Sequence, residues 1–446
     1  MQKKRVLFLT SITVLKYLSG CGSDPGFNED TDFVVDEGSA QFVNLMADSP
    51  NLTILHGLTR SSVQFPFTSP VELRAADDYD WKIIYFNTVE EFDSDNEIIV
   101  AEGEDQVVQK DALSSFLIMG SLNEPNIQIV NHEGKLPSDR PDGEAMLWFA
   151  SNSSNFDMVS IFLSALNEDL SSLTPLATLN RGTFSDLIAV ASGTERQLRI
   201  TETASGKLIF DSGSIEIPDK SNELFAIVDD FGPNQEEHVN VIRTLSASRS
   251  IIPDINQPAF ARAGNFSDFE QVSVVLGDTG FGEINFQDVS DYREIMSGEI
   301  NLDINDNEAS LEESSQTGVK GNFQSLFVFS DKSDLDKPAT RSLSTLDDFR
   351  PVIDRALFKF VNGSDQTLDL YAVEPGDDIK DQNPLLNDFG FGGSGTTEVL
   401  ARPADLIVAN EDSSETLTLL SLDFIAGKSY TVIYDSSGNL ILQLGQ

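Results

Sequence analysis

Short runs in which apolar and polar residues alternate recur along the whole chain, and a period of two predicts β-strands rather than helices. Four segments share one opening pattern: Ala, an alternating apolar run, a turn rich in Asn, Ser and Asp, and a second apolar run. They are AQFVNLMADSPNLTIL from Ala40, AMLWFASNSSNFDMVSIFL from Ala145, AFARAGNFSDFEQVSVVL from Ala259 and ALFKFVNGSDQTLDLYAV from Ala356. Each segment predicts a strand, a turn and a second strand.

The openers start 105, 114 and 97 residues apart, which indicates four internal repeats. A second block, S-D-apolar-x-x-apolar-x-S-G, occurs at 185–193 and again at 290–298. Each repeat closes with a polar turn and an apolar strand, as in KDALSSFLIMG and IAGKSYTVIYD. Repeats of about 100 residues with about seven short strands predict an all-β fold of four tandem immunoglobulin-like β-sandwiches. Two larger β-domains or a propeller are the alternatives, although propeller blades have only about 40–50 residues.

Changes in composition divide the chain into a signal peptide, an acidic tether and the four repeats. The predicted boundaries are 1–20 for the signal peptide, 21–37 for the tether, and 38–135, 143–246, 257–345 and 353–446 for the repeats. Polar, Pro-bearing stretches at 132–144, 246–258 and 346–354 are predicted to be linkers of restricted flexibility. Such linkers are compatible with a straight or a folded-back array.

The N-terminus has the pattern of a bacterial lipoprotein leader. A basic stretch at 3–5 precedes ten largely apolar residues at 6–15, too few for the roughly 20 that a membrane-spanning helix needs. The sequence Leu18-Ser19-Gly20-Cys21 then resembles the lipobox, although Lys16 interrupts the apolar run late. The resemblance implies cleavage after Gly20 and a Cys21 that carries diacylglycerol and a further acyl chain such as palmitate. Several acyl chains give stable membrane anchoring. Gly22 in place of Asp implies sorting to the outer membrane.

Charge and cysteine content limit which partners the protein is expected to bind and which interactions can stabilise its fold. Without the four basic residues of the leader, 25 Lys and Arg stand against 73 Asp and Glu, a net charge of −48. A polyanion is a poor partner for nucleic acid, so none is expected. Cys21 is the single cysteine, so each sandwich must be stabilised by core burial without an intramolecular disulfide.

Three blocks together resemble a bacterial family. FVNLMADSPNLTIL, NFQDVSDYREIMSGEINLDI and FIAGKSYTVIYD are similar to the opener, middle and closer of a domain of unknown function, found in repeats on secreted proteins and lipoproteins. Family members open with a V-H-A-S-P-D-A-P-like turn and close with an A-G-x-x-Y-T-V strand. The resemblance covers most of 38–446 and is assembled from different repeats. It implies a surface β-sandwich and no catalytic residues.

Candidate catalytic motifs are few, and no cofactor is expected. His56, His132 and His238 are far apart in sequence and are predicted to be surface residues. The G-x-G-x-x-G match at 390–395 lacks the strand before it and the helix after it that a dinucleotide site requires, so we expect a loop between strands. No G-x-S-x-G occurs.

One segment has spacing suited to a calcium ion. Asp303, Asn305 and Asn307 place oxygen ligands at alternate positions, and the segment resembles the D-x-N-D-N linker of cadherins. Glu308 and Ser314 do not fit an EF-hand register, and a hairpin tip rich in Asn and Asp is the alternative interpretation.

Repetition without a catalytic motif predicts a non-enzymatic protein of the cell envelope, anchored through Cys21. Its partner would be an unidentified protein or polymer at the cell surface. The alternative is a polysaccharide-processing enzyme or accessory that uses an acidic cleft, since paired carboxylates hydrolyse glycosides. A pocket with two facing carboxylates would distinguish the two hypotheses.

Overall fold

The computed structural model describes residues 37–66, 68–86, 96–132, 141–233, 238–245, 248–306, 309–331, 339–380, 382–410 and 416–444. The leader, Cys21 and the acidic tether therefore lie outside the described residues. Among the described residues, no helix is long and apolar enough to cross a bilayer.

Repeat one is a sandwich of two four-stranded sheets, β4-β1-β7-β8 and β3-β2-β5-β6. Its strands are β1 (Glu37–Asn44), β2 (Leu52–His56), β3 (Thr59–Val63), β4 (Glu72–Ala75), β5 (Asp78–Phe86), β6 (Glu97–Val107), β7 (Leu113–Ser121) and β8 (Glu124–His132).

Repeat two has the same plan, with short extra strands and the 3₁₀ turn η3 (Leu170–Ser172). Its strands are β9 (Glu144–Ser151), β10 (Met158–Ala165), β11 (Ala177–Asn180), β12 (Thr183–Phe184), β13 (Ile188–Ala191), β14 (Gly193–Glu202), β15 (Leu208–Asp211), β16 (Ile215–Ile217), β17 (Asn222–Asp229), β18 (Val239–Leu245) and β19 (Ser248–Ile252). β19 pairs with β18, so the first part of the predicted linker 246–258 contains a strand of the sheet.

Repeats three and four repeat the topology of repeat one strand for strand. The strands of repeat three are β20 (Ala259–Asn265), β21 (Gln271–Leu276), β22 (Thr279–Asn285), β23 (Arg293–Ile295), β24 (Gly298–Asp306), β25 (Ala309–Gly318), β26 (Phe323–Asp331) and β27 (Ala339–Leu346). Those of repeat four are β28 (Arg355–Asn362), β29 (Leu368–Val373), β30 (Leu386–Phe389), β31 (Ser394–Leu400), β32 (Pro403–Asn410), β33 (Thr416–Asp423), β34 (Ser429–Tyr434) and β35 (Leu440–Leu444).

The prediction of four β-sandwiches is confirmed, with one strand more than the pattern indicated in repeats one, three and four, and several short extra strands in repeat two. In every repeat the opening strand runs parallel to the closing apolar strand beside it: β1 with β7, β9 with β17, β20 with β26 and β28 with β34. All other pairs of named strands that are neighbours within a sheet are antiparallel. The parallel pair places the opener and the closer of each repeat, the two best-marked blocks in the sequence, at the centre of one sheet.

A serine hydroxyl that binds the backbone of the opening strand, here called the serine clip, explains the repeated S-D block. Ser185 accepts a hydrogen bond from Phe149 N at 3.0 Å through its hydroxyl, and Ser290 does the same for Ala263 N at 3.0 Å. Ser69 takes this place in repeat one, where Phe42 N donates to its hydroxyl at 3.0 Å. The hydroxyl thus satisfies a backbone donor of the opening strand, so the repetition of this serine has a structural cause.

An asparagine closes the opening strand in three of the four repeats. Asn44, Asn265 and Asn362 are completely buried, and each side-chain oxygen accepts from the backbone N–H two residues later. Each side-chain amide donates to a carbonyl of the other sheet: Val63, Ile284 or Phe389. The Asn-rich turn of the openers therefore ties the two sheets of a sandwich together.

Burial alternates strictly in β21, in the second sheet of repeat three, but not in the central strands of the first sheets. β21 shows strict alternation of buried and half-buried residues, as expected for a sheet with one face in the core. In contrast, β17 and β28 are buried at nearly every position, on both faces. The first sheets must therefore be covered on their outer faces as well.

Neighbouring repeats provide this cover. Val43, Leu117 and Met119 of repeat one pack against side chains of β9 and β17 in repeat two, forming one apolar cluster. Phe266, Phe327 and Phe329 of repeat three likewise pack against Val361 and Ile433 of repeat four. Asn152 joins the first pair, because its side chain donates to Leu45 O at 2.7 Å and accepts from Gly120 N at 2.7 Å. The sandwiches thus form two face-to-face pairs.

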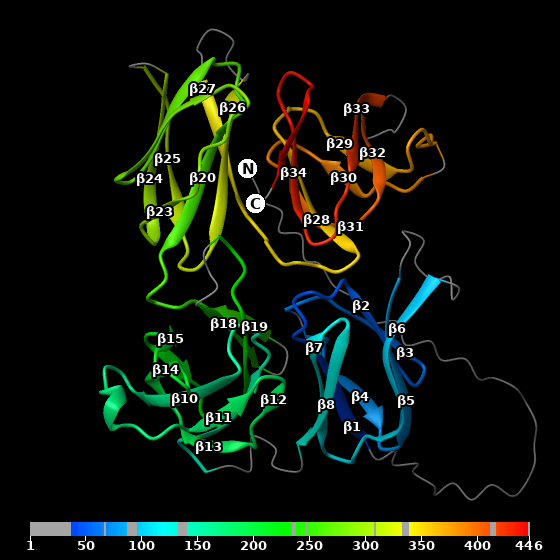
Figure 1. The fold of residues 1–446 in the computed structure, drawn as a ribbon, viewed down its shortest axis with the longest axis vertical. Coiled ribbons are helices and arrows are strands. Elements are labelled where there is room, and N and C mark those ends of the chain that lie inside the picture. Colours follow the sequence, from blue (N-terminus) through cyan, green and yellow to red (C-terminus); the bar gives the residue numbers. More distant parts are fainter. Residues whose placement is uncertain are drawn as a thin grey trace, which may run out of the picture.

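The two pairs close into a two-by-two arrangement in which repeat four lies beside repeat one (Figure 1). Repeats two and three meet where Phe323 packs closely on Gly232, at a distance that would leave no room for a Cβ at Gly232. Repeats four and one meet through Tyr85, whose hydroxyl donates to Asp354 Oδ2 at 3.0 Å, and through Asp48, whose carbonyl accepts from Ile353 N at 2.8 Å. Of the arrangements that the linkers allow, the chain takes the folded-back one.

Candidate functional site

The four repeats meet around the segment 346–354, which was predicted to be a linker. Side chains from all four repeats line a central cavity of about 430 Å³ here, among them Phe65, Asp230, Phe323, Arg350 and Glu398. A larger hollow of about 710 Å³, which we call the 1–4 cleft, lies between repeats one and four. The central cavity and the 1–4 cleft share Gln64, Thr396, Thr397 and Glu398 in their walls. Closure of the four sandwiches therefore creates two adjoining hollows that no single repeat possesses.

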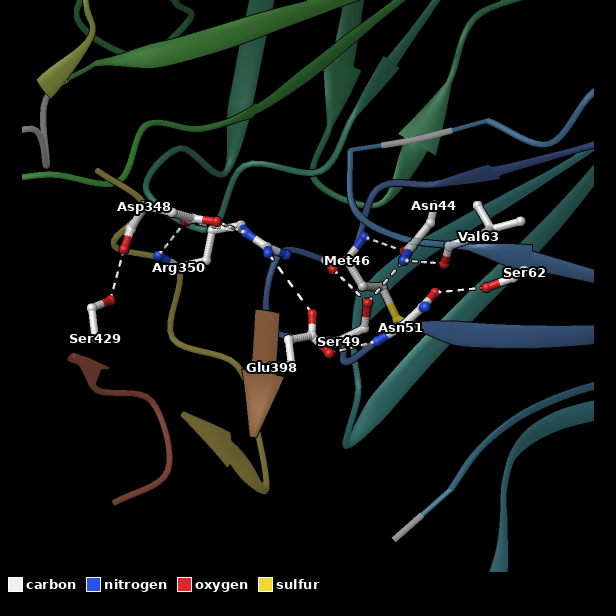
Figure 2. Close-up of polar contacts among 10 residues, drawn as sticks. All are labelled: Asn44, Met46, Ser49, Asn51, Ser62, Val63, Asp348, Arg350, Glu398 and Ser429. Carbon is white, nitrogen blue, oxygen red and sulfur yellow. Dashed lines mark hydrogen bonds and ion pairs between the residues drawn. The ribbon is translucent and has the colours of Figure 1, made fainter. Parts of the chain in front are cut away.

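Arg350 is the cationic centre of this junction. Its Nε donates to Asp348 Oδ2 at 2.9 Å, and its Nη2 lies 3.9 Å from Glu398 Oε1 on β31 (Figure 2). The guanidinium carbon lies 5.3 Å from the Phe65 ring centroid. Only 6% of Arg350 is exposed, although sequence reasoning placed it in a polar linker.

Glu398 connects repeat four to repeat one. Its Oε2 accepts from Asn51 N at 2.9 Å, and Asn51 Oδ1 accepts from the Ser62 hydroxyl at 3.0 Å (Figure 2). On the other side of Arg350, the carbonyl of Asp348 accepts from the Ser429 hydroxyl at 2.7 Å. A continuous polar path thus crosses from repeat four to repeat one.

Three buried charged groups in this junction keep unused hydrogen-bonding capacity. Within the described part of the chain, Arg350 Nη1, Glu398 Oε1 and Asp230 Oδ2 are buried and have no hydrogen-bond partner. Leaving such a group unsatisfied costs about 1–3 kcal/mol. All three residues line the central cavity.

Burial also shifts the titration of the two acids. Desolvation raises the pKa of Glu398, against the lowering effects of the Asn51 N–H and of Arg350 and Arg355. Desolvation likewise raises the pKa of Asp230 to about 6, although Gln257 and Asn240 lower it. Both carboxyl groups are therefore poised to accept or share a proton with a bound ligand more readily than a surface acid.

The 1–4 cleft contains an unusual concentration of arginine for this chain. Arg60, Arg355 and Arg402 line it, and Glu398 is the one carboxylate among its described lining residues. The Arg60 guanidinium lies 5.1 Å from the Phe86 ring centroid, and Arg355 donates to the Phe86 carbonyl. Arg402 pairs with the exposed Glu374 at 2.6 Å. The cleft is thus cationic at its rim, in contrast to the acidic cleft of the enzyme hypothesis.

The calcium candidate is only partly described. Asp303 and Asn305 lie on β24, two positions apart and therefore on one outward face, while Asn307 lies outside the described residues. Asp303 lies opposite Glu313 of β25. No group of three or more His, Cys, Asp or Glu suited to a metal ion occurs in the described parts of the chain.

The prediction for His56 was wrong. His56 ends β2 in the core of repeat one, is 1% exposed, and contacts the rings of Phe42, Tyr79 and Phe116. Burial is the main reason that its pKa is lowered to about 4, so the imidazole is neutral at physiological pH. The strand that begins at Leu52 includes His56, one position further than the sequence suggested. His238 is half-buried, 4.0 Å from Asp254 Oδ2, and the side chain of His132 lies outside the described residues.

Residues 390–393 form a loop between β30 and β31, as predicted, and Ser394 and Gly395 already belong to β31. The expectation that no strand precedes the segment was wrong, because β30 ends at Phe389. Gly393 N donates to Gly390 O at 2.9 Å, and the Arg341 guanidinium lies 3.2 Å from the Phe391 ring centroid. The segment therefore packs repeat four against repeat three, and a strand follows it where a dinucleotide site needs a helix.

Sequence reasoning missed Arg350 and Glu398, the residues that define the junction. A single charged residue in a short polar stretch carries no local sign of burial. The one available hint was that Arg350 stands between Phe349 and Pro351, since an aromatic residue and a proline are typical of a packed connection rather than a floppy one.

Comparisons with known proteins leave the family open. No protein-family model matches the chain, and no curated protein matches it. Among solved structures, one match is a carbohydrate-binding module, described as CBMbc (family CBM26) from Eubacterium rectale Amy13K in complex with maltoheptaose. The match has 7% identity and a TM-score of 0.14, and it covers 48% of this chain and 95% of that module.

Proposed function

We propose that this protein is a non-catalytic binding protein of the bacterial cell envelope, held at the outer membrane by acyl chains on Cys21. The proposal combines the lipoprotein-like leader, the resemblance to a repeated surface domain, and the shared junction of the four sandwiches. The ligand is bound at that junction, in the central cavity and the 1–4 cleft.

One observation carries the binding function: Arg350, which is buried, and Glu398, whose side chain is 10% exposed, line a hollow made by several repeats, and each has a buried atom without a hydrogen-bond partner in the described structure. Binding sites are concave and contain a few placed polar groups among apolar walls. Phe65 and Phe323 supply the apolar wall beside these charges. An ion pair with a structural role alone would be more stable with all of its hydrogen bonds satisfied. The unpartnered atoms therefore favour a binding role.

Hydrolysis of a polysaccharide is the competing function, and the 1–4 cleft does not favour it. Two carboxylates that flank one bond are needed for glycoside hydrolysis. Glu398 alone supplies a carboxylate to the described wall of this cleft, whereas Asp229, Asp230, Asp347 and Asp348 also line the central cavity.

Membrane anchoring is tested with Cys21→Ser in cells fed labelled palmitate. We expect the wild-type chain to carry label and to sediment with membranes, and Cys21→Ser to lose both properties. Ser23→Ala is the matched control and should behave as wild type. Label on Cys21→Ser, or absence of label on the wild-type chain, would contradict the proposed membrane anchor at Cys21.

Binding is tested by probing arrays of envelope and extracellular glycans and peptides with the purified full chain in detergent. We expect a ligand whose binding falls at least about tenfold in Glu398→Gln, since hydrogen bonds to charged groups are worth about 1.5–3 kcal/mol. Glu270→Gln, on the exposed surface of repeat three, is the control. Binding that is equally strong in both variants would place the site elsewhere and contradict the proposal.

A further inference from the structure

The 1–4 cleft has a charge opposite to that of the protein that contains it. The chain has a formal net charge of −44, with 29 Lys and Arg against 73 Asp and Glu. The cleft wall nevertheless contains Arg60, Arg355 and Arg402 and one acid, the buried Glu398. A concave surface of one charge sign focuses the field and concentrates ligands of the opposite sign. The charge of the cleft therefore favours an anionic ligand.

Arg402 and Arg60 are both partly exposed at the cleft, where an added anion would reach them. The ion pair of Arg402 with Glu374 is exposed, with 39% and 63% of the two side chains accessible, so it is weak and exchangeable. Arg60 is exposed on the edge strand β3 and lies over Phe86, which holds its guanidinium plane in the cleft. A guanidinium has five donors in a fork that matches carboxylate and sulfate oxygens.

A simple anion would match only the arginines in the wall of the 1–4 cleft. Neutral hydrogen-bonding side chains contribute much of the remaining surface: Asn51, Thr53, Ser62, Gln64, Asn383, Thr396 and Thr397. Glu398 Oε1, buried and without a hydrogen-bond partner in the described structure, needs a donor. A hydroxyl group both donates and accepts, so a hydroxyl-rich ligand satisfies Glu398 and the amide side chains together.

We propose that the 1–4 cleft binds an anionic saccharide, whose acidic groups pair with Arg60, Arg355 and Arg402 and whose hydroxyls bond to Glu398 and the neutral polar side chains. This inference rests on the proposed binding function and names its ligand class. The volume of about 710 Å³ lies within the range of ligand sites, roughly 300–1,000 Å³. An extended acidic peptide is the competing occupant, because β3 and β31 are edge strands of their sheets. The many hydroxyl and amide side chains favour the saccharide.

The test is calorimetric titration of the full chain in detergent with four probes: an oligogalacturonate, a sulfated galactan oligomer, a neutral galactan oligomer of equal length and a glutamate peptide. We expect an acidic saccharide to bind at least about tenfold more tightly than the neutral one, and more weakly as salt rises. The galacturonate and sulfated arms show whether the acid is a carboxylate or a sulfate.

Variants connect this binding to the cleft. Arg60→Gln and Arg402→Gln should each weaken the acidic saccharide about tenfold without a change in melting temperature, because both side chains lie at the rim. Arg181→Gln, exposed on repeat two, is the matched control and should bind as wild type. Equal affinity for the neutral oligomer, wild-type affinity in both rim variants, or arginine-dependent binding of the glutamate peptide alone would overturn the inference.

Failure of the inference can be told from failure of the proposed function. If no acidic saccharide binds but the arrays yield a ligand that depends on Glu398, the binding function stands and the ligand class is wrong. If nothing on the arrays depends on Glu398, both are wrong.

Discussion

Lys359 Nζ lies 2.8 Å from Asp347 Oδ1, in a polar network that is buried between repeats three and four. Asp347 also accepts from Tyr292 Oη at 2.8 Å and from Ser325 Oγ at 2.6 Å, and it lies 3.9 Å from Arg262. One carboxylate therefore balances two buried cations, and burial is the main reason that the pKa of Lys359 is lowered.

Removal of that carboxylate should destabilise the chain far more than removal of the lysine. Asp347→Asn keeps the shape but leaves Lys359 and Arg262 buried without a counter-charge, at a cost of about 3–5 kcal/mol. Lys359→Met leaves Arg262 to balance Asp347, so we expect a clearly smaller loss. Urea unfolding measures both free energies, and equal losses would contradict the assignment of Asp347 as the shared partner.

His56 should make the chain less stable as the pH falls. Its pKa is about 4 in the folded protein against 6.5 for an unperturbed imidazole, so only the unfolded state takes up a proton between these values. Full stability is present above pH 6.5 and declines toward pH 4, by about 3 kcal/mol in total. His56→Phe should flatten the dependence of unfolding free energy on pH in this window, whatever its effect at pH 8. An unchanged slope, or an imidazole resonance of His56 that titrates near pH 6.5, would show that the ring is not buried neutral.

Asp230 should destabilise the chain when it ionises. Its folded pKa of about 6 is above the ordinary value of 3.8, so the folded state holds the proton more tightly between these values. This contribution is lost as the pH rises through 6, at a cost of about 3 kcal/mol at neutral pH. Asp230→Asn keeps a partner for Asn240 and should raise the melting temperature at pH 7.5, with little gain at pH 3.5. A gain of equal size at both pH values would point to packing instead of charge.

Asn152 should hold repeats one and two together through its side chain. Asn152→Ala removes the bonds to Leu45 O and Gly120 N, and leaving these backbone groups unsatisfied costs about 1–3 kcal/mol. The loss should appear in thermal unfolding and as faster proteolysis between the repeats. Asn155→Ala, three residues further on and exposed, should change neither. A neutral Asn152→Ala would mean that water replaces the side chain at this interface.

Much of the architecture could be predicted because its determinants are local. The alternation in AFARAGN and QVSVVL, and the Asn, Ser and Asp between such runs, specify strands and turns within about ten residues. Residues that recur in the repeats, such as Asn265 and Ser290, form equivalent hydrogen bonds in the structure. The glycine loop at 390–395 was predictable for the same reason, since a strand pattern follows it directly.

The double burial of the first sheets was not predictable from alternation alone. The segment FKFVN in β28 has an alternating apolar and polar pattern like that of other strands, which predicts an exposed Lys359. Lys359 is nevertheless only 5% exposed. Its outer face is covered by repeat three, and that contact depends on residues far away in the chain. His56 was misplaced for a related reason, because Phe116 and Tyr79, which bury it, come from other parts of the repeat.

The all-β class, the number of repeats and the strand-and-turn pattern of each one follow from local sequence, since period-two patterning and turn chemistry act between near neighbours. Contacts between distant repeats make the four sandwiches close into one arrangement and bring Arg350, Glu398 and the cleft arginines together. Asn51 and Glu398 are 347 residues apart in the chain, and their hydrogen bond exists because repeat four folds back onto repeat one. Burial and charge at such a junction depend on packing between repeats, which local pattern does not encode.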